Sequence, residues 1–302
     1  MATITEGQFQ IGDTSFYTKT WTPEGLIKAK LIFVHGFSEH INRYNDFFPK
    51  LTEHGIQVLS WDQRGWGRTV TKPAERGLTG PTALVLSDVA AFVQDKLPSD
   101  VPVFLMGHSM GGGEVLMLAG EPQYKSLIGQ VRGIILECPF IGFTKGEEPS
   151  SVKIALGRLA AKLLPKQQLV HIVPPEHLSR DQVVVDSVRN DPLCHNTGTL
   201  QGLASLLDRT ALLQSGAVKL SKEVQSVLLT HGTRDLTCSY DKAMEFVKNQ
   251  THIEDKTSKS YDGGYHQLHS DLCKDEFAKD VVDWILERSN DGAQIGKIEA
   301  KL

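Results

Sequence analysis

The chain has 302 residues, which corresponds to about two domains of ~150 residues or to one larger α/β domain. Hydrophobic residues make up 40% of it and charged residues 23%, so a disordered, collagen-like or low-complexity protein is excluded. The net charge of −4 contains no large basic excess, which argues against nucleic acid as a partner. These values do not decide whether the 302 residues form one large domain, two domains or one domain with an insertion.

The N-terminal sequence and the cysteines bear on localisation. Residues 1–13, MATITEGQFQIGD, have neither the basic nor the apolar region of a secretory signal. No run approaches the ~18 apolar residues of a membrane span. The four cysteines are scattered and form no CxxC pair. We therefore expect a cytoplasmic protein that is not secreted and whose thiols are reduced.

Short apolar runs alternate with longer segments of helical periodicity along most of the chain. An antiparallel hairpin is predicted at 7–11 and 15–21, followed by strands at 29–34, 56–61, 101–106, 131–136, 224–229 and 257–261. Helices are predicted at 43–54, 82–97, 110–119, 242–247 and 277–286. This order implies parallel crossovers, and the uninterrupted apolar strands fit a sheet covered on both faces. The sequence therefore predicts an α/β fold with a mostly parallel sheet.

The alternation stops between residues 138 and 223. This stretch contains six prolines and helical pieces but no strong strand, and the strand pattern resumes at residue 224. We therefore predict that residues 1–137 and 224–302 form one core domain. Residues 138–223 would be a helical cap, or lid, inserted into it.

The sequence GHSMG at residues 107–111 matches the pattern Gly-x-Ser-x-Gly. It directly follows a predicted strand and directly precedes a predicted helix. A serine on such a tight turn is pushed out of the top of the sheet, and the flanking glycines avoid a clash. The helix N-terminus also offers free N–H groups to an anionic oxygen. Ser109 is therefore the candidate nucleophile; the alternative is a structural turn with an ordinary N-cap serine.

A nucleophilic serine needs a base, and the base needs an orienting carboxylate, in the chain order serine, acid, histidine. Asp235 lies just past the predicted strand 224–229 and is the candidate acid. His266 follows the last predicted strand and the pair Gly263-Gly264, which would form a flexible loop that carries the imidazole over the sheet edge. His266 is therefore the candidate base.

Other polar residues compete for these roles. His269 lies three residues beyond His266 and remains an alternative base, whereas His252 precedes the last strand and is less suited by its position. Three residues at strand ends are expected to fix loops by hydrogen bonds: His35, His231 and Asp62, the last of them near Arg64 or Arg68.

The tetrahedral intermediate of acyl transfer requires two N–H donors. Met110, the residue after the candidate nucleophile, is expected to supply the first. The second should come from the loop that follows the strand 29–34, and there we predict the N–H of Phe37.

Five motifs together resemble the monoacylglycerol lipases of the α/β-hydrolase superfamily. They are HGFSEHINRY (35–44), DQRGWGRT (62–69), GHSMGG (107–112), HGTRDLTC (231–238) and GGYHQLH (263–269). Each motif alone is common among α/β-hydrolases, and their combination is more specific. The resemblance extends over most of the chain and implies an α/β-hydrolase fold with an inserted helical cap.

The resemblance also implies a function. A serine hydrolase of this family cleaves the ester bond of monoacylglycerols to glycerol and free fatty acid through an acyl-enzyme intermediate, with no cofactor and no metal. By matching motifs, Ser109, Asp235 and His266 are the catalytic triad, and Phe37 and Met110 are the oxyanion donors.

Some residues of these motifs need separate comment. Cys238 matches a cysteine near the active site of relatives, although a buried apolar thiol is an equally good interpretation. Phe37 replaces the small residue common in animal relatives, and Arg68-Thr69 departs from the usual ending of its loop. These departures concern the fit of the substrate and leave the chemistry intact.

Other functions remain open at this stage. The same triad serves a lysophospholipase, a general carboxylesterase or a peptidase, and the fold also carries non-catalytic ligand receptors. An aminopeptidase would need acidic residues in the cap to hold an amine, whereas the segment from 149 to 175 contains no acidic residue and its predicted helix is basic. The oligomeric state is not predicted.

Residues 151–164 (SVKIALGRLAAKLL) predict a basic amphipathic helix. Its apolar stripe includes Val152, Leu156, Leu159 and Leu163, and Lys153, Arg158 and Lys162 lie on the other side. Such a helix can lie on an anionic membrane, from which a lipid hydrolase must extract its substrate. The alternative is a cap helix that packs its stripe on the domain below. We place Leu156 and Leu159 near the substrate site and expect the protein to act at the surface of membranes or lipid droplets.

Overall fold

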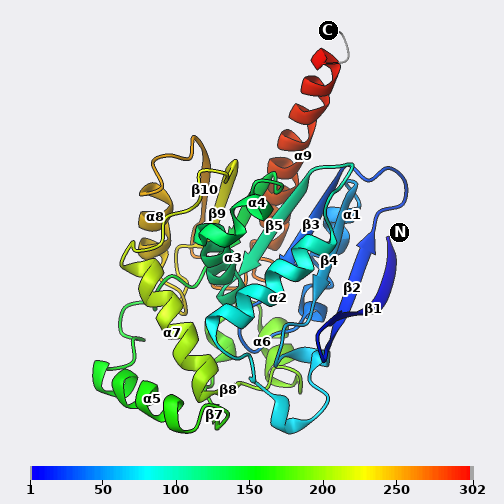
Figure 1. Ribbon diagram of the computed structural model, residues 1–302. Coiled ribbons are helices and arrows are strands. Elements are labelled where there is room, and N and C mark those ends of the chain that lie inside the picture. The colour runs from blue at the N-terminus through cyan, green and yellow to red at the C-terminus, as the bar shows by residue number, and fades with distance from the viewer. Residues whose placement is uncertain (1, 300–302) are drawn as a thin grey trace.

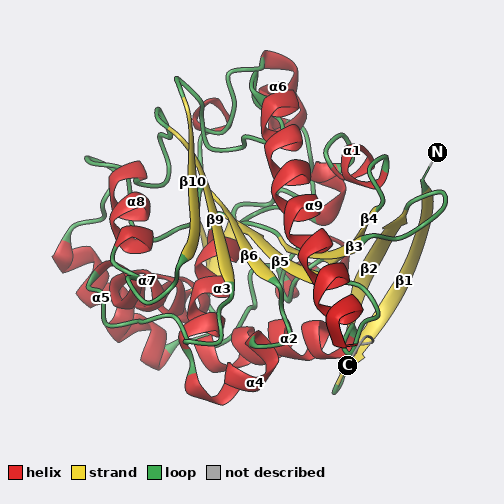
Figure 2. Cartoon of the chain, turned by 90° about the horizontal axis from the view of Figure 1, so that it is seen from above, coloured by secondary structure: helices red, strands yellow, loops and turns green. Residues whose placement is uncertain are grey.

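The computed structural model describes residues 2–299, with side chains described through residue 289. Its centre is an eight-stranded sheet of order β1-β2-β4-β3-β5-β6-β9-β10 (Figures 1 and 2). The strands are β1 (Thr3–Ile11), β2 (Thr14–Thr22), β3 (Ala29–Val34), β4 (Ile56–Trp61), β5 (Val103–His108), β6 (Gly133–Glu137), β9 (Ser226–Gly232) and β10 (Asp255–Tyr261). β2 pairs antiparallel with β1 and β4, and the other pairs are parallel. The predicted hairpin and mostly parallel sheet are confirmed.

The helices that cover this sheet mostly lie where the periodicity places them. They are α1 (Phe48–Thr52), α2 (Thr82–Asp95), α3 (Met110–Gly120), α4 (Lys125–Ile128), α8 (Tyr240–Lys248) and α9 (Lys274–Glu299). The helix expected at 43–54 is instead a 3₁₀ turn, Ile41–Tyr44, followed by α1. Pro49 lacks an N–H and is tolerated only in the first turn of a helix, so a new helix begins beside it.

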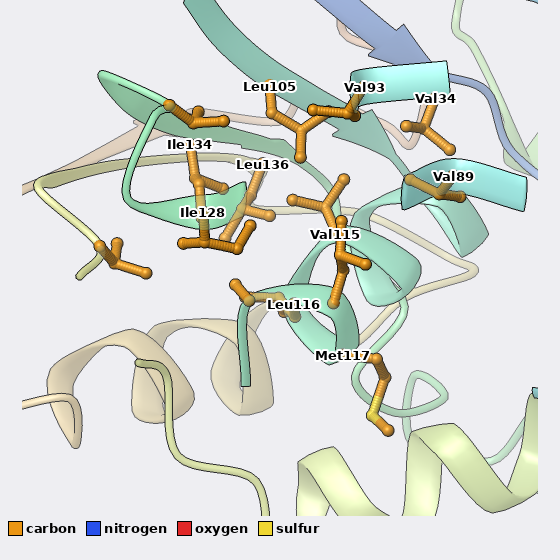
Figure 3. Packing of buried hydrophobic residues seen from close by; sticks show 14 of the residues in the cluster. Val34, Val89, Val93, Leu105, Val115, Leu116, Met117, Ile128, Ile134 and Leu136 are labelled. Carbon is orange, nitrogen blue, oxygen red and sulfur yellow. The ribbon is translucent and has the colours of Figure 1, made fainter. Parts of the chain in front are cut away.

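Residues of the central strands β3, β4, β5, β6 and β9 enter two separate hydrophobic clusters, one on each face of the sheet. On β3, Ile32 and Val34 pack on the side of α2 and α3, and Leu31 and Phe33 pack on the side of α1 and α9. Figure 3 shows the first cluster, and Figure 2 shows helices on both sides of the sheet. Burial on both faces explains why the strands are apolar without alternation.

Between β6 and β9 the chain leaves the sheet. This part contains α5 (Ser151–Leu163), β7 (Gln168–Val170), α6 (Gln182–Arg189), β8 (Thr197–Thr199) and α7 (Leu200–Gln214), which gather at one end of the sheet (Figure 1). β7 and β8 form a small antiparallel pair that the sequence did not predict, because three residues are too few for a recognisable alternation.

The last helix, α9, has 26 residues and continues well beyond the predicted 277–286, away from the body of the molecule (Figure 1). It carries charged residues in every turn of its first half. Within residues 2–299, no helix combines the length and the apolar character needed to cross a membrane.

Candidate active site

Ser109 lies between β5 and α3, at the tip of a strand-to-helix turn. Its backbone has φ 54° and ψ −118°, a strained conformation for a residue with a side chain. Its N–H donates to the carbonyl of Glu137 on β6 (3.0 Å), and its carbonyl accepts from Gly113 (3.1 Å) and Phe140 (2.8 Å). These three hydrogen bonds hold the strained residue in place, as expected for a nucleophile on such a turn.

The two glycines of the motif are required by the close approach of neighbouring backbone. A Cβ at Gly107 would lie 2.4 Å from the carbonyl oxygen of Gly111. A Cβ at Gly111 would lie 2.2 Å from the carbonyl oxygen of Val34, so α3 starts in contact with the end of β3. The sequence-based explanation of these glycines as avoiding clashes agrees with this geometry.

Asp235 and His266 meet beside this turn. Nδ1–H of His266 donates to Oδ2 of Asp235 at 2.8 Å, and both side chains are buried. Oδ1 of Asp235 accepts the N–H groups of Thr237 (2.7 Å) and Cys238 (2.9 Å). Burial raises the pKa of Asp235, but the charge and hydrogen bond of His266 outweigh it, and the pKa lies below its ordinary value. Asp235 is thus an anion that fixes the ring of His266.

The loop that carries His266 is fastened on both sides. The N–H of Arg234 donates to the carbonyl of Gly264 (3.0 Å), and a Cβ at Gly232 would lie 2.3 Å from that carbonyl oxygen. The N–H of Tyr265 donates to Oδ2 of the buried Asp271 (3.0 Å). The pair Gly263-Gly264 therefore serves close packing as well as loop flexibility.

His269, the alternative base, has a different partner. Its Nδ1–H donates to Oε1 of Glu137 (2.7 Å), and its backbone N–H donates to the same oxygen (3.0 Å). Among the described residues, only His266 has a ring nitrogen within hydrogen-bond distance of Asp235. The geometry therefore favours His266 over His269 as the base.

Two of the residues that we expected to fix loops do so directly. His35 donates from Nδ1 to the carbonyl of Gly36 (2.8 Å) and accepts the N–H of Gln63 at Nε2 (2.9 Å). Asp62 accepts the N–H groups of Ile41 (2.8 Å) and Arg68 (2.7 Å). Arg64, named as an alternative neighbour, pairs with Asp88 instead (2.6 Å).

His231 and Cys238 lie against the same site. Nδ1 of His231 donates to the carbonyl of Gly232 (3.1 Å) and lies 3.9 Å from Oδ2 of Asp235. The Sγ atom of Cys238 lies 4.0 Å from Oγ of Ser109 and is fully buried. Burial raises the pKa of this thiol well above its ordinary value, so Cys238 is a neutral neighbour of the serine.

The two predicted oxyanion donors belong to segments that lie next to Ser109. Met110 is the first residue of α3, where an N–H has no partner within the helix. Phe37 follows β3 and lines the same cavity as Ser109. A Cβ at Gly36 would lie 3.1 Å from the Cβ of Ser109, so the loop of Phe37 passes directly beside the serine.

A buried charged cluster lies under Ser109, and the sequence analysis missed it. Oε2 of Glu39 accepts from the hydroxyl of Tyr44 (2.7 Å), Nδ1–H of His108 (3.0 Å) and the N–H of Gly36 (3.0 Å). Nε2–H of His108 reaches the carbonyl of His266 (3.3 Å), and Gln267 donates to the other oxygen of Glu39. The motifs HGFSEHINRY, GHSMGG and GGYHQLH contain these residues, but their contact depends on the fold.

The pKa values of this cluster are those of an ion pair. Burial lowers the pKa of His108, but the charges of Glu39 and Glu137 more than compensate and raise it to about 9. Burial raises the pKa of Glu39, but the charge of His108 and its hydrogen bond outweigh this and hold it well below its ordinary value. Both ring nitrogens of His108 act as donors, which agrees with a charged imidazolium.

A cavity of about 460 Å³ opens above Ser109 and His266. The part of the chain between 138 and 223 supplies most of its apolar wall: Phe140, Phe143, Ile154, Leu169, Val173, Leu178, Val188, Leu200, Leu203, Leu206 and Leu207. This volume and this apolar lining with a few convergent polar groups are typical of a small-molecule site.

The predicted site residues of α5 lie outside the lining of this cavity. Leu156 is 62% exposed and Leu159 is 58% exposed, and Lys153, Ile154, Gly157 and Arg158 of the same helix line the cavity instead. None of the residues of α5 is buried. The alternative in which the apolar stripe packs on the domain below therefore does not describe this helix.

Among the residues with described side chains, three groups bring potential metal ligands within 4.8 Å of one another: His40, Asp191 and Cys194; His108, Glu137 and His269; Cys138, Asp235 and His266. In each group a histidine already donates to a carboxylate of the protein. We assign no metal to them.

From the charged state of His108 we predict how the free energy of unfolding depends on pH. Its pKa is raised above the ordinary 6.5 in the fold, so its stabilisation is complete below about pH 6.5 and lost as the pH rises through about 9. The free energy of unfolding should fall by on the order of 3 kcal/mol across this range. In His108→Gln the free energy of unfolding should be nearly the same at about pH 6.5 and about pH 9, as measured by urea unfolding at both pH values.

The matched control is His231→Gln. Burial lowers the pKa of His231, so this residue is neutral throughout that pH range and its variant should keep the wild-type slope. An equal slope in wild type and His108→Gln would contradict a charged His108.

Comparisons with known proteins show the family of this chain. Residues 25–272 match the family model described as serine aminopeptidase, S33. The chain is 30% identical over 285 residues to the monoglyceride lipase of Mus musculus, covering 90% of this chain and 87% of that protein.

Two solved structures share the fold. A soluble variant of monoglyceride lipase from Saccharomyces cerevisiae, in complex with a substrate analog, matches with a TM-score of 0.84 at 21% identity, over 95% of this chain and 97% of that one. The monoacylglycerol lipase of Paleococcus ferrophilus matches with a TM-score of 0.76 at 23% identity, over 90% and 99% of the two chains. The chain belongs to the serine aminopeptidase S33 family of α/β-hydrolases and is similar, within it, to monoglyceride lipases.

Proposed function

We propose that this protein is a serine hydrolase that cleaves monoacylglycerols to glycerol and free fatty acid. The observation that carries the proposal is the position of Ser109, on its strained turn beside the His266–Asp235 pair, in the wall of an apolar cavity. The names of its relatives in mouse and yeast support the substrate class.

The reaction proceeds in two halves. Oγ of Ser109 attacks the ester carbonyl while Nε2 of His266 takes the hydroxyl proton, and Asp235 holds the ring with Nδ1 protonated. The N–H groups of Phe37 and Met110 stabilise the negative oxygen of the tetrahedral intermediate. His266 returns the proton to the departing glycerol oxygen. Water then attacks the acyl-serine by the same route and releases the fatty acid.

The cavity suits a long acyl chain better than an amine. Its wall is aliphatic and aromatic, and each buried methylene contributes roughly 0.8 kcal/mol of binding. The charged residues that α5 adds to the lining are cations, Lys153 and Arg158. The carboxylate of Glu39 is already paired with His108. A substrate held by its amino group would find no free acid among these lining residues, despite the name of the family.

We propose that residues 138–223 act as the cap of this site, with residues 1–137 and 224–302 as the core domain. The proposal is supported by the share of the cavity wall that this segment supplies. In this arrangement the core domain supplies the proposed catalytic residues, and the cap supplies most of the wall that surrounds the acyl chain.

We also propose that α5 contacts a lipid surface. Val152, Leu156, Leu159 and Leu163 are all more than half exposed, and Leu169, Val170 and Ile172 continue the exposed apolar surface beyond the helix. Figure 1 shows α5 at the periphery of the molecule, beside α7. With Lys153, Arg158 and Lys162, this surface has the composition of an interfacial helix.

A substrate panel tests the proposed function. We expect the highest kcat/KM for monoacylglycerols, compared with di- and triacylglycerols, lysophospholipids and a short nitrophenyl ester. In Ser109→Ala, hydrolysis of every ester should fall by roughly 10⁶-fold, because the nucleophile is lost. Full activity of Ser109→Ala would overturn the mechanism. A preference for lysophospholipids would overturn only the substrate class.

Asp235→Asn tests the role of the acid. The amide would keep the bonds to Thr237 and Cys238, but its NH₂ would face Nδ1 of His266 and move the ring proton to Nε2. His266 could then not accept the proton of Ser109, and kcat should fall by about 10⁴-fold in steady-state assays. If folded His266→Gln stays active while His269→Gln does not, the base has been assigned to the wrong histidine.

Vesicle binding tests the lipid surface. The double variant Leu156→Ser with Leu159→Ser should bind anionic phospholipid vesicles about tenfold more weakly in a sedimentation assay, because it loses apolar area. Leu26→Ser is the matched control, since Leu26 is an exposed leucine of the β2–β3 loop. Unchanged binding by a folded double variant would refute the proposed contact.

A further inference from the structure

A hydrogen bond joins the 138–223 segment to the residue that follows the proposed oxyanion donor Phe37. The N–H of Asn196 donates to Oγ of Ser38 at 2.8 Å. Ser38 directly follows Phe37 and is buried. Both partners have left-handed backbone, with φ 55° at Ser38 and 52° at Asn196. Residues other than glycine keep such a conformation when surrounding contacts determine it.

A stack of rings makes a second connection between the same two segments. The ring of Phe37 meets the buried Trp66 edge-on, with centroids 4.8 Å apart. The other neighbour of Trp66 is the imidazole of His195, stacked at 5.0 Å with an interplanar angle of 9°. The side chain of Phe37 is thus held through Trp66 by the residue that precedes Asn196.

The ring of His195 is itself fixed. Its Nε2–H donates to the carbonyl of Gly65 (3.1 Å), and its Nδ1 accepts the N–H of Thr197 (3.2 Å). This pattern requires the neutral ring. Burial lowers the pKa of His195 to about 4, so the ring is neutral at physiological pH. His195 is therefore locked in one tautomer and one orientation.

We propose that His195 and Asn196 position the oxyanion hole: they hold Ser38 and Trp66, and through them the N–H of Phe37. This inference rests on the proposed function, since it needs Phe37 as a donor. Preorganised donors stabilise a developing negative charge more than flexible ones, so loosening this loop affects the transition state more than the bound substrate. The inserted segment then contributes to the chemistry as well as to the acyl site.

The test compares Ser38→Gly and His195→Ala with the wild type. Glycine tolerates positive φ, so Ser38→Gly removes the acceptor without adding strain. With a short nitrophenyl ester, which depends little on the acyl cavity, each variant should lose about tenfold in kcat, with KM changed by less than about twofold. Affinity for a boronic acid that forms a tetrahedral adduct with the serine should fall by a similar factor.

Gln168→Ala is the matched control. Gln168 also joins the 138–223 segment to the core, through hydrogen bonds to the carbonyls of Pro73 (2.8 Å) and Arg76 (3.0 Å), but it does not touch the loop of Phe37. Its kcat and boronate affinity should equal those of the wild type. Thermal unfolding of all three variants verifies that each is folded.

The inference is overturned if folded Ser38→Gly and His195→Ala keep the wild-type kcat and boronate affinity, or if Gln168→Ala loses as much as they do. It is also overturned if the losses appear only in KM. Failure of the proposed function looks different: the wild type itself would not hydrolyse esters, and a fluorophosphonate probe would not label Ser109.

Discussion

The close approach of α3 to the end of β3 is the constraint on which the site depends. Only glycine fits at residues 107 and 111, because a Cβ at either would overlap backbone atoms. With both glycines present, the turn between them can bring Ser109 to the rim of the sheet with φ 54°. The same approach places the loop of Gly36 against the serine. This packing contact therefore brings the proposed nucleophile and the loop of the proposed oxyanion donor together.

The charged cluster below Ser109 makes this arrangement rigid. Glu39 from the loop after β3, His108 from β5 and Gln267 from the loop after β10 are all buried and hydrogen-bonded together. A buried charge without its partner costs several kcal/mol, so none of these loops can move alone. The cluster also reaches the backbone of His266, so the positions of serine and histidine are linked through the interior.

The sequence was sufficient for what depends on local pattern. The strands, the turn at Ser109 and the pair Asp235–His266 follow from periodicity, glycine spacing and chain order, and the comparisons show the family that the motifs suggested. It was insufficient where distant residues meet. Nothing near Ser38 indicates that its hydroxyl faces Asn196, 158 residues away. The pattern at 151–164 gave an amphipathic helix, but only packing decides that its leucines face outward.

The segment between β6 and β9 divides into two parts with different physical properties. Around β8, the residues His195 and Asn196 are tied to core loops by hydrogen bonds and ring stacking. On α5, in contrast, no residue is buried and the leucines face solvent. Because displacement of α5 would break few contacts to the core, the proposed contact of this helix with a lipid surface is compatible with the proposed role of the β8 region in holding the loop of Phe37. Because the two parts are attached separately, the proposed lipid contact of α5 and the proposed positioning of the oxyanion loop do not depend on the same contacts.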